Sequence, residues 1–175
     1  TVIVSVDSPI TVDAGIDKTI CSGNSTTLKA TGALGYVWTG GGVLDSLVVS
    51  PIVATTYIVT GTSGACHDID TVIVKVDSPI TLDAGADVTI CTRDTVNLRV
   101  TGANTYLWSN GLTEDSIWVK PVVNSTYIVT GTSGACQDID TVTVSFAIPS
   151  IEANAILSNK TYTLCPNTID TLTID

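Results

Sequence analysis

The residues best suited to chemistry in this sequence are its cysteines, which recur in pairs at a fixed spacing. Cys21 and Cys66 lie 45 residues apart, and Cys91 and Cys136 repeat that spacing 70 residues later. Two cysteines per unit suit one disulfide within each unit, Cys21–Cys66 and Cys91–Cys136. Zinc binding is the competing chemistry, but the sequence has no CxxC pair and one histidine, His67. The cysteines therefore indicate an oxidising compartment and predict a covalent staple.

A disulfide within each unit would contribute strongly to its stability. A domain of about 70 residues buries only a modest core. Closing a loop of about 45 residues stabilises a fold by roughly 3 to 4 kcal/mol on the chain-entropy model. The fifth cysteine, Cys165, ends a Thr163-Leu164-Cys165 stretch that resembles Thr89-Ile90-Cys91. We expect its partner to lie beyond the chain end.

The sequence offers no set of residues for catalysis. His67 is replaced by Gln137 at the same place in the second copy, so no Ser/His/Asp triad repeats with the unit. A carboxylate pair for glycoside hydrolysis is the remaining alternative, but solvated aspartates explain the same residues. We expect no enzymatic activity and no catalytic residue.

Aspartates recur at equivalent positions near the joints between the copies. Hard oxygen ligands gathered in this way can hold calcium, although the spacing lacks the loop pattern of an EF-hand. The competing interpretation is that these aspartates cap turns and keep a strand edge soluble. No other cofactor is expected. The calcium candidates are Asp13, Asp17, Asp68, Asp70, Asp83, Asp87, Asp138 and Asp140.

The elements that must position these residues are themselves repeated. Residues 9–78 and 79–148 match at an offset of 70 residues without insertion or deletion. Residues 1–8 match the last strand of the first copy and indicate the end of a preceding repeat. Residues 149–175 indicate the start of a divergent, truncated third repeat. The sequence thus predicts two complete repeats within a longer tandem array.

Each copy contains short segments of period-two alternation separated by turn signals. In the first copy they include Thr27–Thr31, Tyr36–Trp38, Ser46–Ser50, Thr56–Thr60 and Thr71–Val76. Six or seven short strands of this kind predict an all-β fold, a two-sheet antiparallel sandwich. Strand alternation places Tyr36, Trp38, Tyr57 and Val59 in the core.

The charge balance excludes two classes of partner. The chain carries 17 acidic and 7 basic residues, a formal net charge of −10, so nucleic acid and anionic membrane surfaces should be repelled. No apolar run approaches the length of a membrane span. We expect an extracellular, cell-surface location without direct membrane contact, the signal peptide and anchor lying outside this segment.

The sequence frame resembles a known class of repeats. Asp-Ala-Gly-x-Asp-x-Thr-Ile-Cys is followed by Tyr-x-Trp, Thr-Tyr-Ile-Val-Thr-Gly and Gly-Ala-Cys in both copies. This frame is similar to the PKD-type or Ig-like repeats of giant surface proteins exported by the type IX secretion system of Bacteroidetes, the SprB-type gliding adhesins among them. The resemblance implies tandem Ig-like/PKD-like antiparallel β-sandwich repeats of about 70 residues.

A second resemblance concerns modification. Asp followed by Ser or Thr and an aliphatic residue resembles the general O-glycosylation motif of Bacteroidetes, in which the hydroxyl after Asp carries the glycan. Strands that begin after a turn aspartate produce such triplets without any glycan. The candidate glycosylation sites are Ser46, Thr71, Thr95, Ser116, Thr141 and Thr171.

These observations together predict a structural function. We expect a stalk or filament segment of a large secreted cell-surface adhesin, which the resemblance connects with gliding motility, and whose partners are neighbouring repeats and a surface or glycan target. One alternative is a carbohydrate-binding module, because Val48 of the first copy becomes Trp118 in the second. Another is a spacer of a secreted hydrolase. A third is polymerisation by donation of the strand Thr1–Val6.

Overall fold

The computed structural model describes residues 7–91 and 94–146, which form two compact units. Unit 1 extends to Pro79 and also contains Gly134–Cys136, and unit 2 begins at Ile80 and contains the rest. The sequence expectations for Thr1–Val6 and for residues 149–175, including Cys165 and Thr171, lie outside the described residues. Residues 134–136 belong to the second repeat by sequence but to the first unit by structure.

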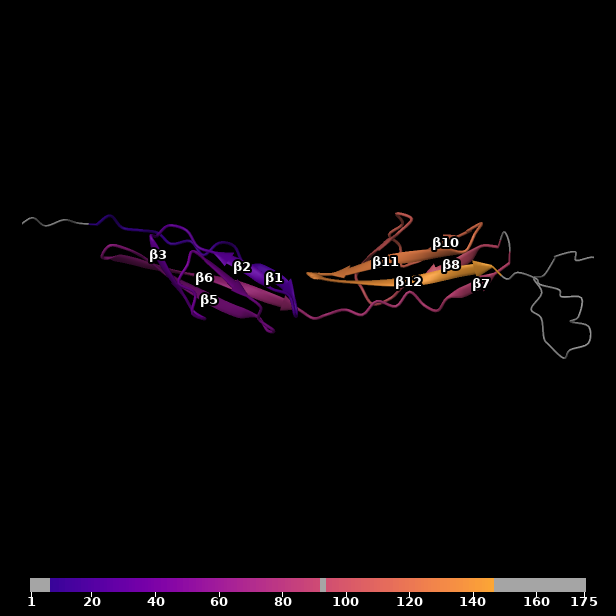
Figure 1. The fold of residues 1–175 in the computed structure, drawn as a ribbon, viewed down its shortest axis with the longest axis horizontal. Coiled ribbons are helices and arrows are strands. Elements are labelled where there is room, and N and C mark those ends of the chain that lie inside the picture. The colour runs from indigo at the N-terminus through magenta and orange to yellow at the C-terminus, as the bar shows by residue number, and fades with distance from the viewer. Residues whose placement is uncertain (1–6, 92–93, 147–175) are drawn as a thin grey trace, which may run out of the picture. The chain divides into compact units, whose positions relative to one another are not determined.

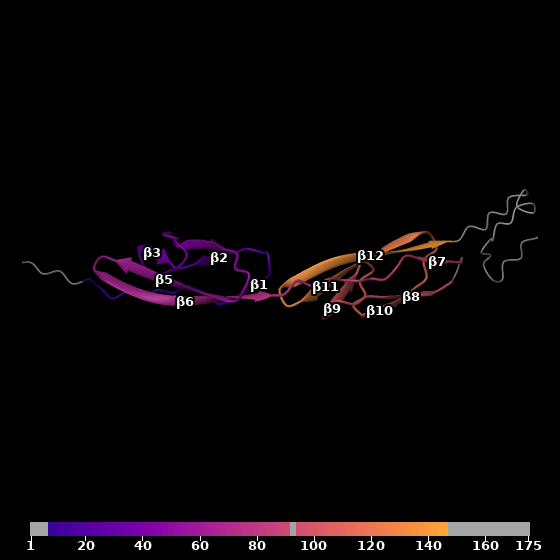
Figure 2. The same cartoon turned by 90° about the horizontal axis from the view of Figure 1, so that it is seen from below.

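Unit 1 is built from six described strands, which make two sheets. One sheet has the order β1-β6-β5-β3 and the other consists of β2 and β4. The long strands β5 and β6 run side by side along the unit (Figure 1, Figure 2). The strands are β1 Lys18–Cys21, β2 Thr26–Lys29, β3 Gly35–Trp38, β4 Ser46–Val49, β5 Thr55–Ser63 and β6 Cys66–Asp77.

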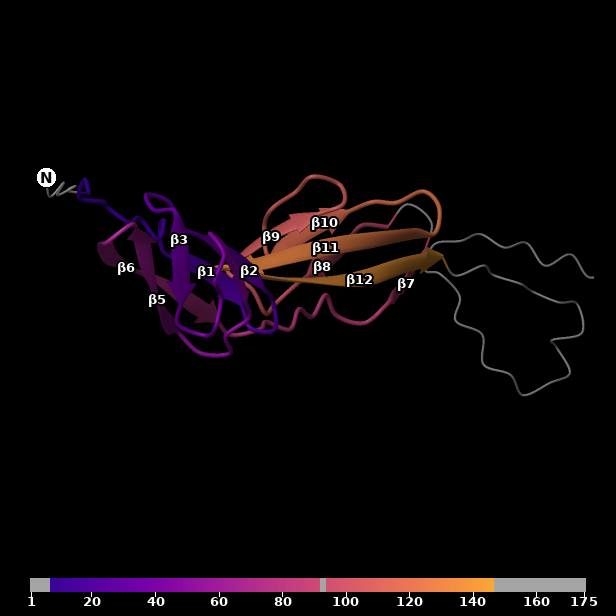
Figure 3. The same ribbon diagram turned by 60° about the vertical axis from the view of Figure 1, so that its left-hand side comes forward.

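Unit 2 repeats this arrangement. Its sheets have the orders β7-β12-β11-β9 and β10-β8, and β11 and β12 run side by side (Figure 3). The strands are β7 Val88–Ile90, β8 Val96–Arg99, β9 Thr105–Trp108, β10 Ser116–Val119, β11 Ser125–Ser133 and β12 Cys136–Phe146.

The strand order confirms the predicted fold class. In each unit the second and fourth strands make one sheet, and the third, fifth and sixth make the other, which is the order of an immunoglobulin-like sandwich. The first strand of each unit adds a parallel pairing: β1 runs parallel to β6, and β7 runs parallel to β12. The described residues form no helix that could span a membrane.

A buried tryptophan lies at the centre of each unit. Trp38 is 2% exposed and Trp108 is 1% exposed. Their indole N–H groups donate to the carbonyl oxygens of Leu44 and Glu114, each at 3.0 Å, so burial leaves no polar atom without a partner. Val59 is also buried, and Tyr36 and Tyr57 pack against the core while partly exposed. The predicted core is therefore confirmed.

The short strands β1 and β7 are the elements that the sequence did not predict. Lys18–Cys21 contains one buried side chain, Ile20, so its alternation is too short to separate from a turn. Its position is instead set by parallel pairing with the end of β6, where Cys21 lies opposite Asp77. This pairing determines which cysteines can meet.

Candidate functional site

The structure contains a disulfide that joins the two sequence repeats. Cys21, the last residue of β1, is bonded to Cys136, the first residue of β12, with the two Cα atoms 4.8 Å apart and a sequence separation of 115 residues. Cys91 is also disulfide-bonded, and Cys66 carries a half-buried free thiol. The expected pairs Cys21–Cys66 and Cys91–Cys136 are therefore wrong.

The geometry of β6 explains this correction. Cys66 is the first residue of β6, whereas Cys21 lies beside Asp77, its last residue. A strand rises about 3.3 Å per residue, which puts these two ends roughly 35 Å apart. A disulfide requires Cα atoms within about 7 Å of each other. The two cysteines of one repeat thus lie at opposite ends of a sandwich.

Asp77 organises the joint at which Cys21 and Cys136 meet. Its backbone carbonyl accepts the Ser22 N–H at 3.0 Å, and the Cys136 Sγ lies 3.7 Å from the same oxygen. Its carboxylate Oδ2 accepts the Ala135 N–H at 2.7 Å. Gly134 has a φ of 57°, and an added Cβ would collide with this carboxylate. Asp77 therefore holds both cysteine-bearing segments.

The same joint recurs one repeat earlier, around Cys66. The Asp7 carboxylate Oδ2 accepts the Ala65 N–H at 2.8 Å, as Asp77 accepts that of Ala135. Gly64 has a φ of 60°, and an added Cβ there would collide with Asp7. Cys66 thus occupies the position of Cys136 in an equivalent turn, but its thiol is free.

The repeated aspartates hold the segment before the first strand against the sixth strand. Asp68 and Asp70 on β6 accept the N–H groups of Val12 and Ala14 through their Oδ2 atoms, each at 2.8 Å. Asp17 accepts the Ile73 N–H at 2.9 Å. In unit 2 Asp138, Asp140 and Asp87 accept the N–H groups of Leu82, Ala84 and Thr143, each at 2.8 Å.

These contacts give the calcium candidates a different role. The remaining two, Asp13 and Asp83, accept the N–H groups of Gly15 and Gly85 within their own turns. Among the residues that the structure describes, no group of three or more His, Cys, Asp or Glu side chains is placed to hold a metal ion. All eight aspartates accept hydrogen bonds from backbone N–H groups, and calcium binding stays a prediction.

Two of these carboxylates have a lowered pKa. The backbone N–H of Ala14, followed by that of Thr71, lowers the pKa of Asp70 from its ordinary value of 3.8. The N–H groups of Ala84 and Thr141 do the same for the pKa of Asp140. Hydrogen bonds from amides favour the charged form of a carboxyl, and partial burial opposes them only weakly here.

We expect acid to destabilise both units through Asp70 and Asp140. A carboxyl whose pKa is lower in the folded chain contributes fully to stability above the ordinary value of 3.8 and loses that contribution as the pH falls through the lowered value. The free energy of unfolding should therefore decrease below about pH 4. Urea titrations followed by circular dichroism would measure it. In the double variant Asp70→Asn/Asp140→Asn the free energy of unfolding should decrease less over that pH range than in the wild type. The same pH dependence in both proteins would contradict the role given to these two carboxylates.

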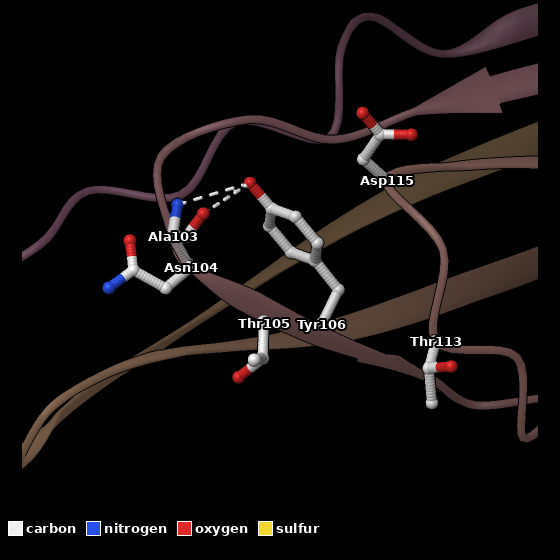
Figure 4. A pocket seen from close by; sticks show the side chains of 6 residues that line it. All are labelled: Ala103, Asn104, Thr105, Tyr106, Thr113 and Asp115. Carbon is white, nitrogen blue, oxygen red and sulfur yellow. Dashed lines mark hydrogen bonds between the residues drawn. The ribbon is translucent and has the colours of Figure 1, made fainter.

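The described residues also line a shallow surface cavity in unit 2. Its volume is about 630 Å³, and its walls include Asn104, Thr105, Tyr106 and Asp115. The Tyr106 hydroxyl points at Ala103, accepting its N–H at 3.2 Å and donating to its carbonyl at 2.7 Å, while the other polar side chains point in different directions (Figure 4). Unit 1 has Leu34 and Gly35 in place of Asn104 and Thr105, so the polar lining is not a property of the repeat.

Trp118 and most of the candidate glycosylation sites lie on the surface. Trp118 is 69% exposed on β10, and Val48 at the equivalent place on β4 is 68% exposed. His67 is exposed on β6 of unit 1 and does not line the cavity of unit 2. Of the described glycosylation candidates, Ser46 is half-buried and the exposed ones are Thr71, Thr95, Ser116 and Thr141.

Solved structures of tandem immunoglobulin-domain proteins are similar to this chain at low identity. Extracellular domains 3–5 of Drosophila OTK match with a TM-score of 0.47 and 12% identity, over 79% of this chain and 62% of that chain. Immunoglobulin domains 1–4 of Sidekick-1 match with a TM-score of 0.42 and 11% identity, over 79% and 48% of the two chains. The chain thus spans less than two thirds of either protein segment. No family model and no curated protein matches the sequence.

Proposed function

We propose that this chain is a structural, non-enzymatic segment of an extracellular stalk or filament. The observation that carries the proposal is the Cys21–Cys136 bond, which links one repeat covalently to the next. A disulfide persists in oxidising compartments, which supports an extracellular location. The two repeats share their fold, cores and aspartate contacts, whereas the cavity lining and His67 differ between them. What is repeated is architecture.

The stalk belongs, in this proposal, to a large cell-surface adhesin. The sequence frame supports an origin in the type IX-secreted, SprB-type gliding adhesins, whose repeats it resembles. Surface hydroxyls at Thr71, Ser116 and Thr141 are open to the proposed O-glycosylation, since a bulky glycan needs an exposed attachment point. The partners of the segment are the neighbouring repeats, and adhesion to a target resides elsewhere in the parent protein.

An in-register deletion tests the proposal. Removing residues 79–148 from the parent protein joins Ser78 to the residue that follows the second repeat and preserves the 70-residue period. We expect antibodies against the chain to label intact cells before and after the deletion, with attachment retained. Labelling only after permeabilisation would overturn the surface location. Loss of attachment with normal surface display would show that the second repeat itself binds the target.

Carbohydrate binding is the second candidate function, and the exposure of Trp118 favours it. An indole 69% exposed on β10 offers a flat apolar face on which a sugar ring can stack. This function requires the chain to bind a glycan and Trp118→Ala to lose that binding. Calorimetric titration with cell-surface polysaccharides decides between the two candidate functions. A stalk segment should bind no polysaccharide, either as the wild type or as Trp118→Ala.

In a stalk of more repeats, Cys66 would be bonded in the same way as Cys136. Because Asp7, Gly64 and Ala65 reproduce the joint around Cys136, we propose that Cys66 bonds to the first cysteine of a preceding repeat. A three-repeat chain tests this: a copy of residues 9–78 carrying Cys66→Ser is inserted before Pro9, which keeps the native Ser-Pro junction.

We expect alkylation and peptide mapping to find Cys66 modified in the original chain and protected in the three-repeat chain. Cys21 and Cys136 should be protected in both, because they are already bonded. A Cys66 thiol that is alkylated equally in both chains would contradict the extended pattern and leave the Cys21–Cys136 bond unaffected.

A further inference from the structure

The two bonded cysteines lie at the boundaries of strands. Cys21 ends β1 and Cys136 begins β12, so the loop closed by the disulfide contains β2 to β6 of unit 1 and β7 to β11 of unit 2. It also contains Trp38 and Trp108 and the chain boundary between Pro79 and Ile80. Only β1, β12 and the segments outside them remain on the direct covalent path between the chain ends.

Tension follows the shortest covalent path. A pull on the chain ends enters β1, crosses the sulfur–sulfur bond and continues along β12, bypassing a sequence separation of 115 residues. Strands in a sandwich are held by hydrogen bonds and apolar packing, which break at far lower force than a covalent bond. The strands inside the loop are therefore not pulled apart in sequence, as they would be in an unlinked array.

The expected intra-unit disulfides would have had a different mechanical effect. A Cys21–Cys66 bond would have bypassed only residues within unit 1, leaving β6, the connection between the units and the strands before Cys91 on the path. The observed bond instead provides a covalent route that bypasses the Asp77–Ile80 connection, so this connection does not carry the tension. Breaking the backbone within the loop would then leave the chain in one piece.

We propose that the Cys21–Cys136 disulfide makes the segment a nearly inextensible tether, by removing most of both sandwiches from the path of tension. This proposal rests on the proposed stalk function, because the chain carries tension between its ends when it is part of a stalk. Its physical basis is independent of the adhesive target and of secretion. An added dithiol reductant, which is itself oxidised to a disulfide as the Cys21–Cys136 bond becomes two thiols, returns the bypassed residues to the path of tension.

Single-molecule stretching of the purified chain between its two ends tests this proposal. At about 3.5 Å per residue, reduction of the bond should lengthen the fully stretched chain by about 400 Å. The oxidised chain should show no force peaks from the strands inside the loop, and the reduced chain should show them. Equal fully stretched lengths with and without reductant would overturn the proposal, whatever the result of cell labelling.

Two variants and a nick make the test independent of folding. Cys66→Ser should keep the reductant-dependent lengthening, and Cys21→Ser/Cys136→Ser should extend further than the oxidised wild type before reductant is added. The cleavage test uses a chain that carries Cys91→Ser, which removes the second disulfide, and Glu152→Gln, which leaves Glu114 as the one glutamate of the sequence. Cleavage after the exposed Glu114 by a glutamate-specific protease should leave its two sides joined in denaturant and separate them on reduction. Separation without reductant would contradict the bypass, and adding Glu114→Gln to the same chain gives the uncut control.

Discussion

Replacing Trp108 by alanine should destabilise unit 2 by about 3 to 5 kcal/mol, the usual cost of truncating a buried tryptophan. The indole is 1% exposed and packs among Leu98, Val129 and Val144. Its removal leaves a cavity that the surrounding strands cannot fill, and it leaves the Glu114 carbonyl without its donor. Urea denaturation followed by circular dichroism would measure the loss, with unit 1 as the internal reference.

Trp118→Ala is the matched control, since it makes the same chemical change on the surface of the same unit. Trp118 is 69% exposed, and surface substitutions away from special features usually change stability by less than about 0.5 kcal/mol. A comparable loss in both variants would contradict the assignment of Trp108 as the centre of the core. Trp38→Ala should have the corresponding effect on unit 1, because Trp38 occupies the same place there.

Cys21→Ser should also lower the stability of the chain substantially. Opening a loop with a separation of 115 residues returns entropy to the unfolded chain, worth about 5 kcal/mol on the chain-entropy model for complete unfolding. Cys136→Ser should have the same effect, and reduction, which also opens the disulfide of Cys91, should lower the stability by at least as much. The shift in denaturation midpoint, measured with and without reductant, checks this expectation.

Cys66→Ser provides the control for the disulfide variants. It also removes a sulfur atom, but Cys66 carries a free thiol and closes no loop. Its stability should therefore stay close to that of the wild type and remain sensitive to reductant. If Cys66→Ser were the destabilised variant and Cys21→Ser were not, the pairing within one repeat would be correct after all.

The sequence determined the repeat, the strand composition and the core of each unit. Aligning the two copies at a fixed offset shows which positions carry the same residue in both. Period-two alternation identified most of the strands around Trp38 and Trp108. Local patterns suffice for this because an apolar side chain on alternate residues selects one face of a strand. The repeat and the strands can both be inferred without information on which distant strands pair.

The aspartates show where local patterns stop being sufficient. Repeated carboxylates near a joint are compatible with calcium binding as well as with turn capping, because the sequence does not give their partners. Asp70 meets the Ala14 N–H across 56 positions of chain, a distance that no local motif reveals. The tertiary structure shows that Asp68 and Asp70 on β6 accept hydrogen bonds from the segment before β1.

The cysteine pairs that define this sequence were identified from spacing, but their partners were not. Spacing alone favours the shortest loop, between two cysteines of one repeat. The parallel pairing of β1 with β6 places Cys21 beside Asp77 and far from Cys66, and Cys136 meets it at the Asp77 carbonyl. The sequence by itself indicated that the repeated cysteines form disulfides and placed one within each repeat. Only the tertiary structure decided that a disulfide joins successive repeats, because disulfide formation requires proximity in space and not along the chain.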